Sequence, residues 1–444
     1  MKFEMRMPDL ATTDSPIKVL NWLVEIGAPV KRGQAVVEVE TDKATMEVDA
    51  TVNGTLLERR CEMGAELSAG EVLAIIETSE ETAETRPGSE RQRSGRGVPA
   101  ANHRIEAARE TSIPLSQPRD CALLSREFLL TLYERIVLIR EFEERVKMLF
   151  LEGAMPGTIH QCQGQEATAV GVCGALENDD FIVSTFRGHG HALAKGLTVQ
   201  EMLDELFGAA TGCCKGKGGS MHMGNMDKGM LPAIAIVAGG IPLAAGMALA
   251  FKMRKTRQVV ACFFGDGAVA EGAFHEGVNI AAIWNLPVVF VCENNLYGAS
   301  TRIDKVMKLT KISDRAASYG FRGETVDGND LLAVYEAAGR ASEECRSGRG
   351  PLLLELLTYR RTGHSRRDPC HYQAKDEREA WLANDPIDRF AEVLLARGDI
   401  SWPDLSDIKA KIDREIREGI EKARRAPPPG RNQLLRDVYA REEE

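Results

Sequence analysis

An aspartate and an asparagine follow two apolar segments of the chain, and their side chains are of the kind that bind a hard cation. Asp266 follows QVVACFF (258–264) and a glycine, and Asn295 ends PVVFVCENN (287–295). The intervening residues read as a tight turn and a helix, which predicts one βαβ unit with parallel strands. Both residues would then lie at the carboxyl edge of the sheet, where α/β folds bind ligands. A carboxylate and a carboxamide oxygen suit Mg²⁺ at such a place.

The glycines beside Asp266 fit an anionic ligand. Gly265 and Gly267 let the backbone approach a ligand closely, and a helix predicted to begin near Ala268 would point its positive end at an anion. An ordinary Rossmann-type turn is the alternative for a lone Gly-Asp-Gly. However, the segment lacks the G-x-G-x-x-G and GxxxxGK[ST] patterns, so the usual loops for dinucleotides and nucleoside triphosphates are missing.

Composition changes along the chain predict its domain organisation. Residues 1–80 contain short alternating runs such as AVVEVE and EVLAIIE, which indicate strands. Residues 81–120 are polar and rich in Gly, Ser and Pro, so we expect a flexible linker. Residues 121–425 combine helical patterns (REFLLTLYERIVLIREFEERV, TVQEMLDELFG, AVYEAAGRASEEC) with apolar strands, and 426–444 form a C-terminal tail.

The N-terminal segment contains an internal repeat. GAPVKRGQAVVEVET (27–41) aligns without a gap with GAELSAGEVLAIIET (64–78). Two similar halves predict a pair of packed antiparallel sheets related by a pseudo-twofold axis. After the first copy, Thr41-Asp42-Lys43 interrupts two alternating strands, which predicts a hairpin with Lys43 at its exposed tip.

This segment resembles the lipoyl domain family, whose modified lysine lies in an ETDKA hairpin that matches residues 40–44. The resemblance implies a small all-β sandwich with a lipoyl group on Lys43. Biotin carriers share the architecture, but methionines flank their lysine where this chain has Asp42 and Ala44; an unmodified lysine is the other alternative. A lipoyl arm on a flexible linker would reach any site in range at roughly millimolar effective concentration.

The segment from Gly265 to Asn295 resembles the thiamine-diphosphate-binding motif. Around it, HQCQGQEA (160–167), FRGHGH (186–191), KGKGGSMHM (215–223), ENNLYG (293–298) and YRRTGHSRRDP (359–369) occur in the order typical of the alpha subunit of 2-oxo acid dehydrogenases. Within that family the pattern is most similar to the bacterial pyruvate and acetoin dehydrogenases. The resemblance implies an α/β domain with a parallel sheet and helices on both of its faces.

Roles in the family carry over to matching positions of this chain. The resemblance implies that Mg²⁺ is bound by Asp266, Asn295 and the main-chain carbonyl of Tyr297. Arg187, a planar fork of donors, would bind the diphosphate. The residues near the coenzyme would be Phe186, Val237, Gly267 and Ala268, and the histidines near the reacting carbon would be His160 and His364.

Other polar residues of these motifs are expected to frame the site. His189, His191 and His222 would support it without taking part in the chemistry, and KGKGGS is read as a structural glycine loop at its border. Ser365 stands where some relatives are phosphorylated, and we treat it as a loop serine. Three departures from the family pattern concern Phe186, which replaces Tyr or His, the pair Pro232 and Ala235, which replace glycines, and the fused lipoyl domain.

The resemblance also implies partners. In this family, the coenzyme attacks a 2-oxo acid, carbon dioxide leaves, and the acyl group passes to a lipoyl disulfide. The glutamate that activates the coenzyme belongs to a separate beta chain. We therefore expect a heterotetramer of two alpha and two beta chains that works with a lipoyl acyltransferase, and an alpha chain that is inactive alone. Pyruvate is the leading substrate; acetoin and branched-chain 2-oxo acids are alternatives.

Composition limits the remaining function classes. The chain is 43% hydrophobic and 27% charged, and its net charge of −10 argues against nucleic acid and anionic membranes as partners. The cysteines are scattered without a Cys-x-x-Cys pair, so we expect small core residues in a reduced cytoplasm. The N-terminus carries no apolar leader, which indicates neither secretion nor import. The alternative to an enzyme is a lipoyl carrier or scaffold protein whose thiamine-diphosphate-binding fold has lost its function.

Overall fold

The computed structural model describes residues 2–7, 17–31, 34–40, 45–50, 52–68, 71–77, 124–365, 368–433 and 436. The chain divides into two compact units. The first contains Met1–Pro114 and Met148–Ala154, and the second contains Leu115–Lys147 and Met155–Glu444. The expected linker 81–120 and the lysine Lys43 lie outside the described residues, and the expected domain boundaries stay a prediction.

Two four-stranded antiparallel sheets form the N-terminal unit. The first has the order β1 (Lys2–Arg6), β8 (Val72–Glu77), β6 (Gly54–Arg59) and β3 (Pro29–Val30). The second has the order β5 (Thr45–Asp49), β4 (Ala35–Glu40), β2 (Ile17–Trp22) and β7 (Glu66–Leu67). Buried side chains from both sheets form one apolar core that includes Val19, Val39, Leu56 and Ile76.

The structure confirms the internal repeat. Strands β2, β3 and β4 begin at residues 17, 29 and 35, and β6, β7 and β8 begin at residues 54, 66 and 72, which is a constant offset of 37. Two hydrogen bonds follow the same symmetry. The main-chain N–H of Gly27 donates to the main-chain oxygen of Leu56, and the N–H of the equivalent Gly64 donates to the oxygen of the equivalent Val19, both at 2.7 Å. This reciprocity is what a pseudo-twofold axis between the sheets requires.

Strands β4 and β5 confirm the predicted hairpin around the lysine. They pair in an antiparallel manner, and Glu40 is opposite Thr45 in the register. The connection between them is therefore the ETDKA segment, although residues 41–44 themselves are not described.

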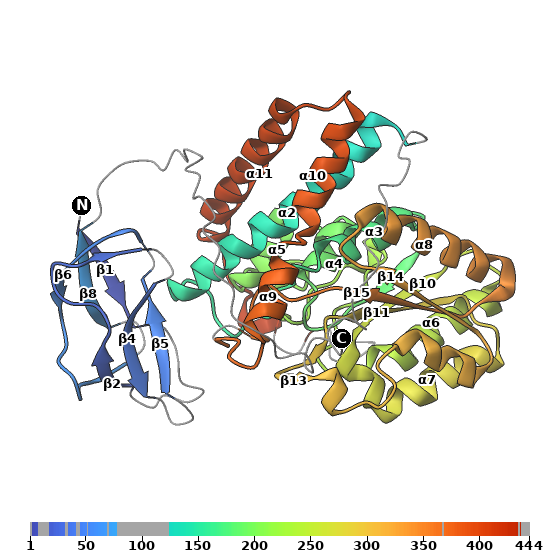
Figure 1. Cartoon of the computed structure of the whole chain (residues 1–444), viewed down its shortest axis with the longest axis horizontal. Helices are drawn as coiled ribbons and strands as arrows, with labels where there is room; N and C mark the ends of the chain where they lie inside the picture. Colours follow the sequence, from blue (N-terminus) through green and yellow to red (C-terminus); the bar gives the residue numbers. More distant parts are fainter. Residues whose placement is uncertain are drawn as a thin grey trace, which may run out of the picture. The chain divides into compact units, whose positions relative to one another are not determined.

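A five-stranded parallel sheet forms the centre of the second unit (Figure 1). Its order is β14 (Arg322–Asp327), β15 (Leu352–Leu357), β11 (Val288–Asn294), β10 (Val260–Gly265) and β9 (Phe181–Val183). All seven residues of β11 are buried, as expected for a central strand that is covered on both faces. The long apolar runs in the sequence therefore mark the middle of this sheet.

Helices cover both faces of the parallel sheet, as the family resemblance implied. On one face, α8 (Leu331–Glu344) contacts β11, β14 and β15, and α3 (Glu166–Ala175) packs against α8. On the other face, α6 (Gly240–Arg254) contacts β9, β10 and β11, and α7 (Gly272–Ile283) packs against α6 (Figure 1). The βαβ unit predicted between residues 258 and 295 is thus confirmed as β10, α7 and β11.

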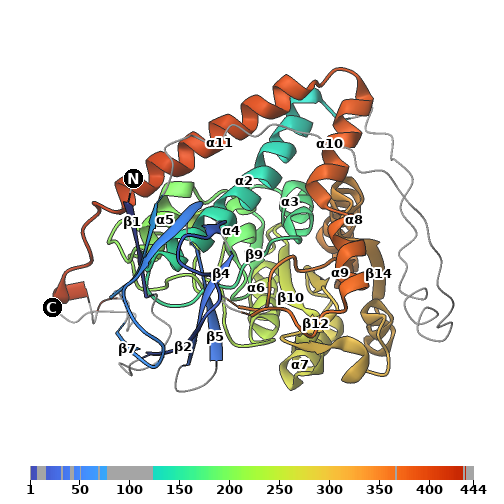
Figure 2. The same ribbon diagram turned by 60° about the vertical axis from the view of Figure 1, so that its left-hand side comes forward.

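The remaining helices of this unit surround the sheet region. They are α2 (Arg126–Leu151), α4 (His189–Lys195), α5 (Val199–Leu206), α9 (Lys375–Leu382), α10 (Pro386–Arg397) and α11 (Trp402–Ala423). Ion pairs Arg126–Asp404 at 2.8 Å and Arg145–Asp413 at 3.0 Å join α2 to α11 (Figure 2). Among the described helices, none has both the length and the apolar character that a membrane span requires.

Candidate active site

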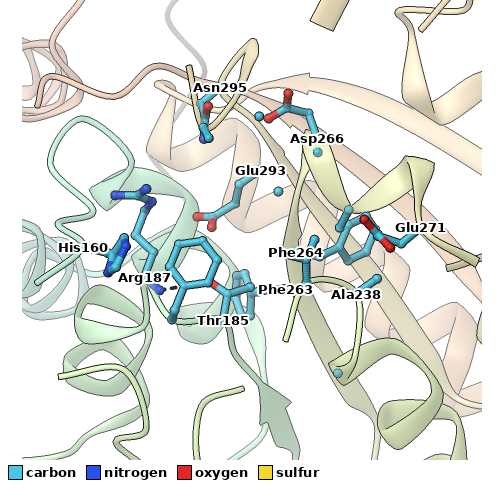
Figure 3. A pocket seen from close by; sticks show the side chains of 18 of the residues that line it. His160, Thr185, Arg187, Ala238, Phe263, Phe264, Asp266, Glu271, Glu293 and Asn295 are labelled. Atoms are coloured by element: carbon cyan, nitrogen blue, oxygen red, sulfur yellow. Dashed lines mark hydrogen bonds between the residues drawn. The ribbon is translucent and has the colours of Figure 1, made fainter. Parts of the chain in front are cut away.

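The register of two neighbouring strands brings Asp266 and Asn295 to one edge of the sheet. Strands β10 and β11 run parallel, and Gly265 is opposite Glu293. Asp266 directly follows β10, and Asn295 directly follows β11. Their side chains lie near each other at the carboxyl edge (Figure 3), and both residues are buried. The geometric expectation from the sequence is therefore confirmed.

A cavity of about 610 Å³ opens at this edge, inside the C-terminal unit. It collects all ten residues of this unit that the sequence singled out for the coenzyme, the metal ion or the chemistry. They are His160, Phe186, Arg187, Val237, Asp266, Gly267, Ala268, Asn295, Tyr297 and His364. In Figure 3, Asp266 and Asn295 lie at one end, and His160 and Arg187 lie along another wall.

The turn after Asp266 differs from the expectation. Residues Asp266–Ala270 form a short 3₁₀ helix, and the α-helix α7 begins only at Gly272. Glu271 has an extended backbone between them, which separates the two elements. The prediction of a helix that begins near Ala268 was therefore wrong by four residues. A 3₁₀ turn offers few aligned N–H groups, so the positive end of a long helix is not what Asp266 and Gly267 present to the cavity.

Asp266 is a buried carboxyl group without a direct counter-charge. It is 2% exposed, and within the described part of the chain it has no ion-pair partner. Burial raises the pKa of Asp266 to about 6, although the nearby guanidinium of Arg360 opposes this shift. A bound cation would replace the lost hydration of the carboxylate and favour its ionised form.

The side-chain amide of Asn295 is held in one orientation. Its Nδ2 donates to Oε1 of Gln165 at 3.1 Å, and its Oδ1 accepts a hydrogen bond from the main-chain N–H of Tyr297 at 3.3 Å. Gln165 thus fixes which end of the amide is nitrogen. The oxygen of Asn295 lies on the side of Tyr297. Asp266, Asn295 and Tyr297 all line the cavity, so a carboxylate, an amide and a main-chain carbonyl are the oxygen types that these three residues can offer to a cation.

Arg187 connects three segments of the cavity wall. Its Nη1 donates to the main-chain oxygen of Gln161, and its Nη2 donates to the main-chain oxygen of His364 at 3.0 Å. Burial and the neighbouring Arg360 lower the pKa of Arg187 to about 10. Arg187 is therefore still a cation at neutral pH, and it lies in an enclosed site where charge acts strongly.

His160 and His364 form an aromatic cluster with Phe186. Their rings meet edge to face, and the centroid distances are 4.8 Å for His160–Phe186 and 5.7 Å for Phe186–His364. Burial, followed by the charge of Arg187, lowers the pKa of His160 to about 3 and that of His364 to about 4. The buried Nδ1 of His160 has no hydrogen-bond partner in the described structure. The cluster is therefore neutral, with one polar atom available to a ligand.

The expected framing histidines do not line the cavity. His189 bonds through Nδ1 to Glu143 at 3.1 Å and through Nε2 to Ser220 at 2.9 Å. His191 lies 3.3 Å from the carboxylate of Glu293. A third histidine, His222, contacts the main-chain oxygen of Ala233 at 2.9 Å. These bonds fix the position of the walls, which agrees with the framing role expected for them.

Three residues that the sequence reasoning missed belong to this region. Gln165 and Glu293 line the cavity, and Arg360 is a 1% exposed guanidinium that influences Asp266, Arg187 and both cavity histidines. Gln165 and Glu293 stood inside the quoted motifs, next to residues that were chosen, so the motif itself was the available signal. Arg360 also stood inside a quoted motif, YRRTGHSRRDP, but nothing in the local sequence distinguishes it from the neighbouring arginines.

Two of the residues that depart from the family pattern, Phe186 and Ala235, line the cavity. Phe186 packs against both histidines, so its ring supplies packing in place of a hydroxyl or imidazole hydrogen bond. Ala235 lines the cavity and Pro232 lies three residues before it. Ala238, also in the wall, has a φ of 61°, a left-handed conformation that is costly for a residue other than glycine.

The sequence of the chain matches two family models. That of the family "Dehydrogenase E1 component" covers residues 134–431, and that of "Biotin-requiring enzyme" covers residues 3–76. The chain is 48% identical over 322 residues to the alpha subunit of acetoin:2,6-dichlorophenolindophenol oxidoreductase from Bacillus subtilis (strain 168), which covers 72% of this chain and 96% of that protein.

Two pyruvate dehydrogenase E1 component alpha subunits are also similar. That of Porphyra purpurea is 39% identical over 324 residues, covering 71% of this chain and 94% of its own length. That of Rhizobium meliloti (strain 1021) is 39% identical over 322 residues, which cover 71% of this chain and 91% of that protein. The chain therefore belongs to the dehydrogenase E1 component family as an alpha-type subunit, and it carries an N-terminal domain of the biotin/lipoyl type.

Proposed function

We propose that this chain binds thiamine diphosphate through a magnesium ion and forms the alpha half of a 2-oxo acid dehydrogenase. Asp266, Asn295 and the main-chain oxygen of Tyr297 would hold the ion, and Arg187 would bind the diphosphate. The observation that carries the proposal is the common position of Asp266 and Asn295 at one sheet edge, facing one cavity with Arg187. The donor set fits the group, because all the metal ligands are oxygens and the anion would meet a guanidinium.

The residues of the chain would orient the coenzyme and form hydrogen bonds near its reacting part. The bound coenzyme supplies a carbon nucleophile and an electron sink for the pair released with carbon dioxide. His160 and His364 are neutral at pH 7 because their pKa values are lowered, so each ring has one N–H donor and one acceptor nitrogen for hydrogen bonds to a ligand. Phe186 and Val237 would exclude water from the reacting region.

Pyruvate is the substrate we propose, and acetoin is the second candidate. The pyruvate dehydrogenase subunits named above support the first, and the 48% identity to an acetoin oxidoreductase subunit favours the second. Branched-chain 2-oxo acids rank lower. With the beta chain present, turnover of pyruvate, acetoin and a branched 2-oxo acid under identical conditions would separate the three. Pyruvate turnover should exceed the other two, and a faster rate with acetoin would reverse the assignment.

A beta chain would complete the site. Several large apolar side chains on and near α6 and α7 are exposed, among them Ile236 (74% exposed), Leu243, Met253, Ile283 and Trp284. Surfaces of this kind are typical of permanent subunit interfaces. Ile236 also lines the cavity, so a chain docked here would close the cavity wall. We expect it to bring the glutamate that activates the coenzyme, in a heterotetramer of two alpha and two beta chains.

The N-terminal domain would carry the acyl acceptor. We propose that Lys43 is lipoylated and that its arm receives the acyl group, either from this site or from that of another subunit of an assembly with a lipoyl acyltransferase. The support is the ETDKA sequence in the β4–β5 connection of a duplicated sandwich. A cytoplasmic location stays a prediction from the sequence.

Coenzyme binding and subunit dependence test the proposal. Calorimetry with thiamine diphosphate should show binding that needs Mg²⁺ and that is lost when the ion is chelated. Decarboxylation should be near zero for the chain alone and should appear when the beta chain is added. A chain that binds no coenzyme with or without the beta chain would be the lipoyl carrier or scaffold that we rank below the enzyme.

A further inference from the structure

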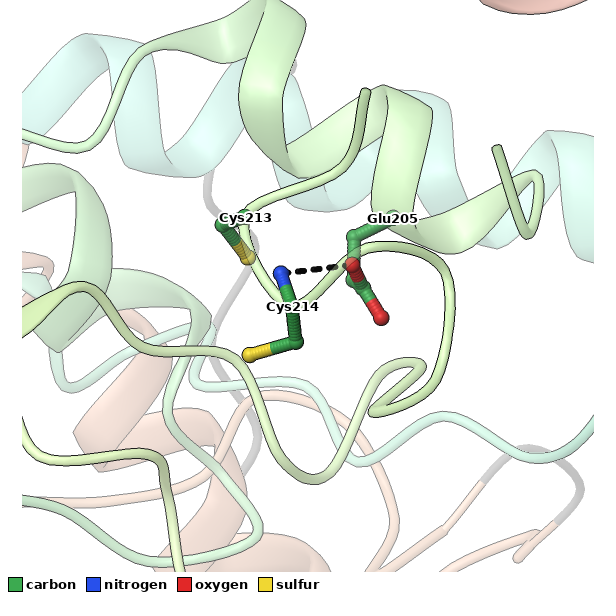
Figure 4. Close-up of side chains that lie close together, drawn as sticks. All are labelled: Glu205, Cys213 and Cys214. Atoms are coloured by element: carbon green, nitrogen blue, oxygen red, sulfur yellow. Dashed lines mark hydrogen bonds between the residues drawn. The ribbon is translucent and has the colours of Figure 1, made fainter. Parts of the chain in front are cut away.

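Two adjacent cysteines lie outside the chemistry described so far. Cys213 and Cys214 are in the loop after α5, and both are partly exposed, whereas six of the seven other described cysteines are buried. Their sulfur atoms and a carboxylate oxygen of Glu205 lie within 4.8 Å of one another (Figure 4). The expectation that the cysteines are small core residues therefore fails for this pair.

The cluster is not arranged as a metal site, because Glu205 is already fully engaged. Its Oε2 accepts main-chain N–H bonds from Cys214 at 2.8 Å and Gly216 at 2.9 Å, and its Oε1 accepts them from Gly218 at 2.7 Å and Gly219 at 3.0 Å. Four donors satisfy a buried carboxylate. The remaining two thiols are fewer than the ligands that a structural metal site needs.

The thiol pair has the features of a nucleophile with a resolving partner. A hydrogen bond from the Cys213 thiol lowers the pKa of Cys214, and the same contact raises the pKa of Cys213. In its protonated form Cys214 donates to the main-chain oxygen of His222 at 3.2 Å. We assign the first attack to Cys214, because Glu205 holds its main-chain N–H at 2.8 Å and so fixes the position of this residue. The thiolate is the reactive form of a cysteine, and the Cys213 sulfur lies within 4.8 Å of the Cys214 sulfur.

We propose that Cys213 and Cys214 form a redox site at which a hydroperoxide converts the thiol pair to a reversible disulfide. The Cys214 thiol loses its proton, and the thiolate attacks the peroxide oxygen, so that an S–O bond forms and the O–O bond breaks. The leaving alkoxide or hydroxide takes up that proton and departs as an alcohol or water. The Cys213 sulfur then attacks the sulfenic sulfur, so that the S–S bond forms and the S–O bond breaks. The leaving hydroxide takes the Cys213 proton as water. Two thiols are oxidised by two electrons and one peroxide is reduced.

The disulfide would be easily reduced again. Adjacent Cα atoms are about 3.8 Å apart, whereas disulfides usually join Cα atoms about 4.4–6.8 Å apart. A bond closed at this distance is strained, and strained disulfides are the labile, regulatory ones. Forming this disulfide would move the main-chain N–H of Cys214 relative to the carboxylate of Glu205. The glycine loop (215–220), which the same carboxylate holds, would then become less tightly bound. Met221, at the end of that loop, lines the cavity, which links the redox site to the cavity wall.

Peptide mass spectrometry tests the redox site directly. Trypsin releases residues 196–215 as one peptide that contains Cys213 and Cys214 and no other cysteine. After treatment of the whole chain with one equivalent of hydrogen peroxide, this peptide should lose two hydrogens and regain them with dithiothreitol. Hydrogen exchange of the glycine-loop amides held by Glu205 should become faster in the oxidised chain.

Single variants identify the role of each sulfur. Cys213→Ser should leave a sulfenic acid on Cys214 that dimedone traps, and Cys214→Ser should leave Cys213 reduced at the same peroxide concentration. A peptide that stays reduced, or that oxidises only to sulfinic and sulfonic acids, would overturn the proposal. Equal dimedone labelling of both variants would overturn the assignment of Cys214 as the nucleophile, and unchanged amide exchange would overturn the link to the loop.

Discussion

The imidazole rings of His160 and His364 meet edge to face at the cavity wall, with their centroids 5.2 Å apart. The two residues are far apart in the sequence, and Arg187 holds the second one by its main-chain oxygen. Burial and the positive charge of Arg187 lower both pKa values, to about 3 and about 4. At neutral pH the pair is therefore two neutral rings beside a cation, which is an arrangement suited to hydrogen bonding with a bound ligand.

This pair should make the stability of the folded chain depend on pH. Histidine in an unfolded chain titrates near pH 6.5, so the unfolded chain binds more protons than the folded one between about pH 6.5 and the lowered pKa values. Stability is therefore complete above pH 6.5 and falls as the pH drops toward 4. Allowing for partial solvent screening, we expect a loss on the order of 1 kcal/mol at pH 5.

Unfolding in urea between pH 8 and pH 5 measures this effect. The double variant His160→Asn, His364→Asn should lose stability less steeply than the natural chain as the pH falls. His371→Asn, the same change at an exposed histidine, is the matched control and should keep the natural slope. Identical slopes for all three proteins would contradict the lowered pKa values.

Asp266→Asn should strongly weaken magnesium-dependent coenzyme binding. The change removes the carboxylate and keeps its size, so we expect thiamine diphosphate affinity to fall by at least about 100-fold, which is about 2.7 kcal/mol. Because burial raises the pKa of Asp266 to about 6, the natural chain should also bind more weakly as the pH drops below 6, where the carboxyl takes up a proton that competes with the cation.

Calorimetry at pH 7.5, 6.5 and 5.5 follows both effects. Glu271→Gln is the control, because it also neutralises a carboxylate in the cavity wall, and Glu271 is exposed and outside the donor set. Its affinity should stay within a few-fold of the natural value. Equal losses for the two variants would mean that Asp266 contributes only general charge and does not hold the ion.

The sequence predicted the features that depend on local pattern and on strand order. Apolar runs located β10 and β11, and their parallel pairing followed from the connection between them, so the common edge position of Asp266 and Asn295 could be deduced. The offset in the N-terminal repeat likewise predicted two matching sheets. In both cases the pattern of neighbouring residues is sufficient, because burial on strands follows a period of two or a continuous apolar run.

Features that arise only from distant contacts were not predictable. Arg360 follows strand β15, and its guanidinium donates to the main-chain oxygen of Ala299 at 2.7 Å. Its burial therefore depends on a part of the chain that is distant in the sequence. Gln165 stood in a quoted motif, but its hydrogen bond with Asn295 joins two separate elements, so the motif alone did not show this contact. The 3₁₀ turn after Asp266 ends because Glu271 takes an extended conformation, a choice that residue type alone does not determine.

Lys43→Arg should remove a covalent modification from the chain. If the β4–β5 connection presents a lipoyl site, intact mass of the chain from cells that supply lipoate should exceed the sequence mass by one lipoyl group. The excess should vanish in Lys43→Arg and persist in Lys18→Arg, a control on the exposed side of β2. A biotin-sized excess, or none, would replace lipoylation with one of the alternatives stated for this lysine.

Arg187→Lys should reveal how much of the coenzyme affinity depends on the planar guanidinium. Both side chains carry a positive charge, but lysine cannot bond the main-chain oxygens of Gln161 and His364 at the same time as the diphosphate. We expect a loss of affinity of about 10-fold for Arg187→Lys and a larger one, of about 100-fold or more, for Arg187→Ala.

Because Arg187 also fixes the His364 segment, proteolysis between residues 360 and 369 should become faster in both variants. Arg361→Lys, outside the cavity lining, controls for the loss of an arginine near the same segment. If Arg187→Lys bound the coenzyme as tightly as the natural chain, charge alone would explain the role of this residue, and the forked geometry would be irrelevant to it.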